Sequence, residues 1–131
     1  MRRLLDTNIC VFALKRRPEI LDRLQMLSPD DVAISSVTLA ELWFGARKST
    51  RPQSTRAAVD AFVRPLEVVP FDAEAAEAYA EIRLALERAG QPIGERDLLI
   101  ASTARSRDFA VVTHNTAEFT RVPGLEVEDW L

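Results

Sequence analysis

Short apolar segments that alternate with longer helix-forming segments restrict the fold of this chain more than any other feature. The candidate strands are residues 2–6, 31–35, 66–71 and 109–113, with 125–130 as the last candidate. Helical patterns occupy residues 7–15, 18–27, 37–48, 51–65, 72–89 and 97–106. Parallel strands need such crossovers. We therefore predict an α/β fold with three α/β/α layers around a central, mostly parallel sheet. The length predicts a single domain over residues 1–131.

The composition excludes several classes of protein. The longest apolar runs have six residues, far below the roughly 20 that span a bilayer, and the N-terminal segment lacks the features of a signal peptide. We therefore expect no membrane association and a cytoplasmic location. With one cysteine and one histidine, the chain can form neither an internal disulfide nor a Cys/His zinc site. Glycine-rich phosphate loops and the G-x-S-x-G element are also absent.

Three acidic residues adjoin apolar segments at the ends of predicted elements. Asp6 follows the first strand, Glu41 lies within the apolar helical segment "LAELWF", and Asp97 begins the apolar run "DLLIA". Ligand sites of open α/β sheets gather outside the carboxyl ends of the strands. A carboxylate in apolar surroundings is costly without a partner or a metal. The three acids together are therefore candidates for one site.

Each of these acids also has a purely structural explanation. Asp6 could form an Asx turn or cap the next helix. Glu41 could face the polar side of its helix with Thr38 and Lys48, and Asp97 could interact with the helix dipole in a first turn. A fourth polar segment, "VVTHNTAEF", follows the strand at 109–113 and places Thr113, Asn115 and Glu118 near the same edge. Carboxylates that meet in one cleft repel each other, and Mg²⁺ or Mn²⁺ relieves that repulsion with oxygen ligands.

The motifs "LLDTN", "SSVTLAEL", "PIGERDLLIASTA" and "VVTHNTAEFTRVPGLEVEDW" resemble those of PIN-domain ribonucleases, and within them VapC toxins of VapBC toxin–antitoxin modules. The resemblance runs from the first residues to the last. It implies a PIN-like domain and a metal-dependent endoribonuclease that cleaves RNA and leaves a 5′-phosphate and a 3′-hydroxyl. It also implies a homodimer and a VapB-like antitoxin that forms a hetero-oligomer with the toxin and inserts a segment near the acidic cleft.

Position by position, the resemblance implies roles for particular residues. Asp6, Glu41 and Asp97 match the family's metal-binding acids, directly or through water, for Mg²⁺ or Mn²⁺. Asn8 matches a polar residue that helps to hold the first carboxylate. The usual further aspartate falls on Asn115, which is neutral, so Glu118 is the candidate for a distal ligand. Thr113 and Asn115 are candidates for orienting the ligands. Alternatively, Glu118 only begins a short turn and points to solvent.

Charge is distributed unevenly along the chain. The net charge of −3 argues against a nonspecific nucleic-acid binder, yet residues 1–65 carry 11 Lys and Arg against 7 Asp and Glu, whereas residues 66–131 carry 6 against 13. This permits a local positive face. The candidates for contacts with RNA phosphates are Arg47, Lys48, Arg51 and Arg56. Their structural alternative is a solvated position near a helix end.

Two other functions compete with the nuclease. A phospho-receiver module of the same α/β type needs an adjacent pair of acids after the first strand and a lysine after the last, but only Asp6 follows the first strand and no lysine occurs after Lys48. A catalytically silent PIN-like scaffold that binds RNA or a protein is the second alternative. The presence of all three acids argues against it.

Overall fold

The computed structural model describes residues 1–131 and contains five strands and seven α-helices. The strands are β1 (Arg3–Leu5), β2 (Val32–Ser35), β3 (Glu67–Val69), β4 (Ala110–Val112) and β5 (Val127–Glu128). The helices are α1 (Thr7–Leu14), α2 (Pro18–Gln25), α3 (Ser36–Lys48), α4 (Pro52–Val63), α5 (Ala73–Arg88), α6 (Glu95–Ser106) and α7 (Thr116–Phe119), and a 3-10 turn, η1 (Pro29–Asp31), precedes β2. No helix combines the length and apolar character needed to cross a membrane.

The five strands form one sheet in the order β3-β2-β1-β4-β5, and every neighbouring pair is parallel. The chain places β2 and β3 on one side of β1 and then returns to place β4 and β5 on the other side. The direction of winding therefore changes between β1 and β4. At such a switch point the connections leave in opposite directions, which opens a crevice at the carboxyl ends of the two strands.

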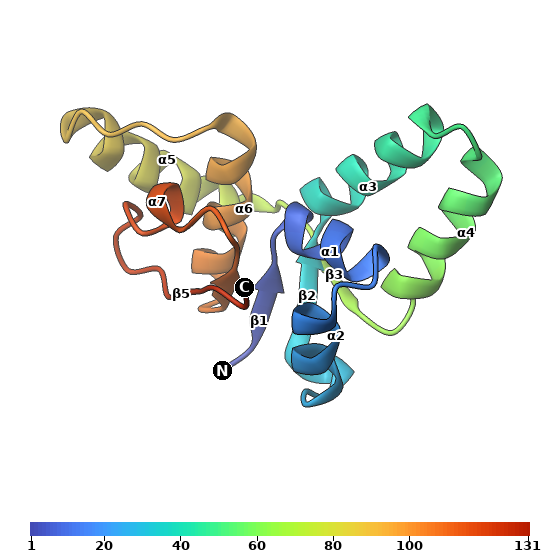
Figure 1. Ribbon diagram of the computed structural model, residues 1–131. Coiled ribbons are helices and arrows are strands. Elements are labelled where there is room, and N and C mark those ends of the chain that lie inside the picture. Colours follow the sequence, from blue (N-terminus) through green and yellow to red (C-terminus); the bar gives the residue numbers. More distant parts are fainter.

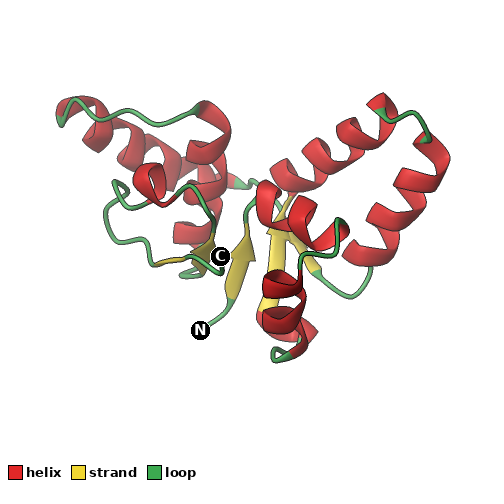
Figure 2. Ribbon diagram, viewed as in Figure 1, coloured by secondary structure: helices red, strands yellow, loops and turns green.

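Alternating strand residues bury their side chains on opposite faces of the sheet, as the pleat of a strand requires. Leu4 and Val111 belong to a core that also contains buried residues of α5, α6 and α7, whereas Leu5 and Val112 belong to a second core with residues of α1, α3 and α4. Figure 1 shows these two groups of helices on either side of the strands, and Figure 2 shows the strands between them. The predicted three-layer α/β/α architecture with a parallel sheet is confirmed.

Two local details differ from the sequence prediction. Helix α6 begins at Glu95 rather than at Asp97, so Asp97 lies in its first turn. A first helical turn needs no apolar side chain, and the hydrophobic pattern therefore marked the start of burial at Leu98 rather than the start of the helix. The segment after β4 contains a short helix, α7, which places Phe119 in the core as one of the largest fully buried side chains.

Candidate active site

Asp6 lies directly after β1 and is almost fully buried, with 4% of its surface exposed. It is the N-cap of α1, and its Oδ1 accepts a hydrogen bond from the backbone N–H of Thr7 at 2.7 Å. Its Oδ2 accepts one from the hydroxyl of Thr113 at 2.8 Å. Burial raises the pKa of Asp6, the two hydrogen bonds oppose that rise, and the charge of Glu41 adds to it. The capping role and a site role thus coexist in one carboxylate.

Glu41 faces the same crevice from the second turn of α3. Its Oε1 accepts a hydrogen bond from the hydroxyl of Thr7 at 2.7 Å, and the Thr7 hydroxyl also lies 3.1 Å from that of Thr38. Its Oε2 pairs with the guanidinium of Arg96. Both carboxylate oxygens of Glu41 are therefore engaged, one by α1 and one by α6.

Asp97 and Glu118 are joined through Asn115. The side-chain amide of Asn115 donates to Oδ2 of Asp97 at 2.9 Å and to Oε2 of Glu118 at 2.7 Å. Burial raises the pKa of Asp97 to about 7, and the interaction with Glu118 and the charge of Asp6 add to the rise. The hydrogen bond with Asp97 holds the pKa of Glu118 below its ordinary value. Near neutral pH, Asp97 therefore keeps part of a proton while Glu118 stays ionised.

A polar cleft of about 620 Å³ lies over these side chains and has no hydrophobic residue in its wall. The residues that line it are Asp6, Thr7, Asn8, Glu41, Gly94, Glu95, Arg96, Asp97 and Asn115. The structure thus brings Asp6, Glu41 and Asp97 together from the end of β1, from α3 and from α6. Thr113 is fully buried and bonded to Asp6, and Glu118 contacts the Asn115 amide without lining the cleft.

The supporting role predicted for Asn8 stays a prediction. Asn8 lines the cleft and is exposed, but neither hydrogen bond to the Asp6 carboxylate comes from it. Thr7 and Thr113 hold Asp6 instead. The sequence prediction missed Thr7 and Arg96. The signal for Thr7 was a hydroxyl next to Asp6. The signal for Arg96 was a basic residue in the first turn of a helix, where the helix dipole disfavours positive charge.

The carboxylates of the cleft have the chemistry that a hard divalent cation requires, since Mg²⁺ and Mn²⁺ prefer oxygen ligands. Asp6 and Asp97 interact electrostatically, and so do Asp6 and Glu41. As the side chains stand, no three acids lie close enough to hold one ion together. Oε2 of Glu41 is already paired with Arg96, whereas no basic side chain pairs with Asp6 or Asp97. These two acids are therefore the candidates for direct ligands, and Glu41 would join them after leaving Arg96 or through water.

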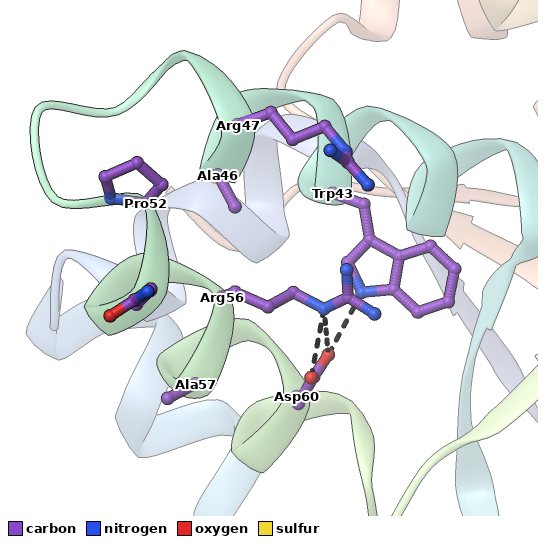
Figure 3. Close-up of a pocket in the computed structure, with 8 residues that line it drawn as sticks. Trp43, Ala46, Arg47, Pro52, Arg56, Ala57 and Asp60 are labelled. Atoms are coloured by element: carbon purple, nitrogen blue, oxygen red, sulfur yellow. Dashed lines mark hydrogen bonds and ion pairs between the residues drawn. The ribbon is translucent and has the colours of Figure 1, made fainter.

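The basic residues predicted to contact RNA lie outside the acidic cleft. Arg47 and Arg56 line a separate pocket of about 450 Å³ between α3 and α4 (Figure 3). In Figure 3, Arg56 extends to Asp60, with both carboxylate oxygens 3.0 Å from its Nε. The guanidinium carbon of Arg56 also lies 4.1 Å from the ring centre of Trp43, and Trp43 donates to Asp60 at 3.0 Å.

The other two basic residues occupy the same end of the α3–α4 pair. Lys48 stacks on the exposed ring of Phe44 at 5.0 Å, and Arg51 is exposed just before α4. Lys48 is seven residues beyond Glu41, about 10 Å along the helix axis. Any contact of these residues with RNA would therefore involve a part of the substrate away from the cleft, and their role stays a prediction.

Known proteins with the same fold match this chain over nearly its whole length. The model of the PIN domain family matches residues 3–125. The tRNA(fMet)-specific endonuclease VapC of Shigella flexneri is 46% identical over 127 residues, which cover 97% of this chain and 96% of the relative. Ribonuclease VapC2 of Rickettsia felis is 41% identical over 129 residues, with 97% and 96% covered.

Solved structures give the same result. DNA-bound VapBC from Salmonella typhimurium contains a chain that superimposes with a TM-score of 0.95 at 42% identity and covers 100% of this chain and 99% of that one. VapBC2 from Rickettsia felis, bound to a DNA fragment from its promoter, gives a TM-score of 0.94 at 40% identity, with both chains covered completely.

Proposed function

This chain belongs to the PIN-domain family and, within it, to the VapC ribonucleases, and on that premise we propose that it is an endoribonuclease that uses Mg²⁺ or Mn²⁺ in the acidic cleft. The observation that carries the proposal is the convergence of Asp6, Glu41 and Asp97. They come from three different elements and meet in a cleft without a single hydrophobic residue in its wall. Burial raises the pKa values of Asp6 and Asp97, and holding such carboxylates together in ionised form is costly unless a cation is part of the site.

The residues of the chain divide into those that would hold the ion and those that orient them. Asp6 and Asp97 would bind it directly, and Glu41 would complete the set from α3. Thr7 and Thr113 fix the Asp6 carboxylate, and Asn115 fixes that of Asp97. The chemistry that a divalent cation supplies when bound is the polarisation of a phosphate oxygen and the activation of water at neutral pH.

We further propose RNA as the substrate and tRNA(fMet) as the first RNA to examine, because relatives from two enterobacterial species carry that specificity in their names. The experiment incubates the chain with tRNA(fMet) and, as a matched control, with the elongator tRNA for methionine. Each reaction is run with Mg²⁺, with Mn²⁺ and with a chelator. Cleavage of tRNA(fMet) that needs metal and leaves a 5′-phosphate and a 3′-hydroxyl would support the proposal. A chain that leaves both RNAs intact with either metal would contradict it.

The proposal includes a protein partner. Solved relatives are complexes of a VapC toxin with its VapB antitoxin, and we propose that this chain likewise forms a homodimer and a hetero-oligomer with a VapB-like antitoxin. An arginine or lysine of the antitoxin at the cleft would compete with the cation for Asp6, Glu41 and Asp97. The proposal places the chain in the cytoplasm, where its RNA substrate is found.

Glu118→Gln is expected to weaken metal binding by about 10–100-fold, the usual effect of removing a group that supports a ligand. Glu118 is the ionised neighbour of Asp97 across the Asn115 amide, so a neutral amide there withdraws negative charge from the site. Metal titration of cleavage at fixed RNA measures the change, and the KM for RNA is expected to stay close to that of the parent. A titration curve that superimposes on the parent's would show that Asp6, Glu41 and Asp97 carry the site alone.

A further inference from the structure

Arg96 is the single basic side chain among the nine residues that line the acidic cleft. It lies beside Asp97 in the first turn of α6, and its guanidinium reaches across the cleft to Oε2 of Glu41 in α3. The side chain of Arg96 is 74% exposed, whereas that of Glu41 is 19% exposed. An exposed, solvated guanidinium therefore pairs with a mostly buried carboxylate.

Arg96 and a divalent cation would compete for the same oxygen of Glu41. The other oxygen, Oε1, is occupied by the hydroxyl of Thr7 at 2.7 Å, within the wall of the cleft. A cation that uses Glu41 from the open side of the cleft therefore meets Arg96. An ion pair with so exposed a partner contributes little to stability, so the guanidinium can leave at small cost.

A bound cation would engage Asp6, Glu41 and Asp97. The exposed Glu95 is then the one carboxylate of the cleft left for the displaced Arg96. An RNA phosphate entering the cleft would meet acids on all sides and this one guanidinium. Arginine presents five donors in a planar fork that matches two oxygens of a phosphate, and its charge persists at any pH of interest. The basic residues of α3 and α4 do not line this cleft and cannot take that role.

We propose that Arg96 is a phosphate-binding residue with two mutually exclusive partners. In the free protein it pairs with Glu41 and occupies the carboxylate oxygen that a cation would use, and when a cation takes Glu41 it contacts an RNA phosphate at the cleft. The inference rests on the proposed function. At low metal concentration the guanidinium of Arg96 weakens metal binding to the cleft. At saturating metal it favours the binding of RNA.

The test is Arg96→Gln, which is expected to change two properties in opposite directions. Mn²⁺ binding to the chain without RNA, measured by calorimetry, is expected to tighten by about 2- to 5-fold because the competing ion pair is gone. The KM for tRNA(fMet) at saturating Mn²⁺ is expected to rise by about tenfold or more. The slope of log KM against log salt is expected to fall by about 0.7, the contribution of one phosphate contact to a single strand. Arg96→Lys is expected to keep the salt slope and to recover part of the KM.

Arg17→Gln is the matched control, since Arg17 is an exposed arginine that pairs with a glutamate, Glu19, outside the cleft. It is expected to change neither Mn²⁺ binding nor the KM. An Arg96→Gln variant that binds Mn²⁺ more weakly would overturn the competition for Glu41, and one with the parent's KM and salt slope would overturn the phosphate contact. If the parent cuts no RNA, the proposed function fails, and the Mn²⁺ titration still decides whether Arg96 competes for Glu41.

Discussion

Asp97→Asn is expected to lower cleavage of RNA by about 1,000-fold or more at any concentration of metal. Asp97 is one of the two acids that we propose as direct ligands of the cation. The stabilisation that a catalytic metal provides amounts to several kcal/mol, at about 1.4 kcal/mol for each factor of ten in rate. Asparagine keeps the shape of the side chain and can still accept the hydrogen bond from Asn115. Single-turnover cleavage of tRNA(fMet) measures the loss. A variant that cuts as fast as the parent would remove Asp97 from the metal site.

The stability of the same variant shows whether it folds correctly. Without metal, its free energy of unfolding is expected to exceed that of the parent. The pKa of Asp97 is raised to about 7 in the folded protein, mainly by burial. Between the unfolded pKa of Asp97 of about 4 and its folded pKa of about 7, a rise in pH ionises Asp97 in the unfolded chain but not in the folded protein. The unfolded state is therefore favoured, and the parent becomes less stable. The difference between variant and parent is therefore absent below about pH 4, grows through the interval and is complete above about pH 7.

The size of that difference is set by the partial exposure of the site. A pKa near 7 in place of 3.8 would amount to about 4 kcal/mol in a dry interior, and screening by solvent reduces the figure to about 1–2 kcal/mol. Thermal unfolding of metal-free parent and variant at pH 4, 6 and 8 measures it. Loss of cleavage together with this gain in stability would exclude misfolding as the cause. A variant less stable than the parent at pH 8 would contradict the assignment of the raised pKa.

Thr113→Val is expected to reduce cleavage by about 10–100-fold, although Thr113 is fully buried and does not line the cleft. Its hydroxyl donates to Oδ2 of Asp6 and accepts from the backbone N–H of Asn115. Valine has the same shape but provides neither contact, so the buried Asp6 carboxylate loses one of its two donors and its pKa rises further. The pH dependence of cleavage at limiting metal is expected to shift upward, because the cation must displace a proton held more tightly.

Thr113→Ser is the matched control, since serine restores the hydroxyl and removes only a methyl group. It is expected to recover most of the activity and to return the pH profile to that of the parent. A serine variant as impaired as the valine variant would mean that packing beneath Asp6, rather than the hydrogen bond, supports the site. The orphaned N–H of Asn115 in the valine variant is also expected to reduce stability by about 1–3 kcal/mol.

The sequence by itself determined the architecture and singled out three acids that the structure brings to one cleft. Hydrophobic periodicity and helix caps are local, and each segment therefore carried its own evidence: Asp72 and Ser35 accept hydrogen bonds at the helix starts where their types predict caps. Because parallel strands end at one edge of the sheet, the position of Asp6 after a strand was enough to place it at that edge. Glu41 and Asp97 were singled out by their places beside apolar segments, and the resemblance then implied their role as metal-binding acids.

Only the tertiary structure decided how the acids are held and which residues are their hydrogen-bond and ion-pair partners. The Glu41–Arg96 pair joins residues 55 positions apart, and the Asp6–Thr113 bond joins residues 107 apart. Such contacts depend on β4 lying beside β1 rather than at an edge. The packing of whole crossover helices against the sheet sets that order, and no single segment of the sequence predicts it. Thr7 and Arg96 therefore became visible as parts of the site only when the elements that carry them were packed together.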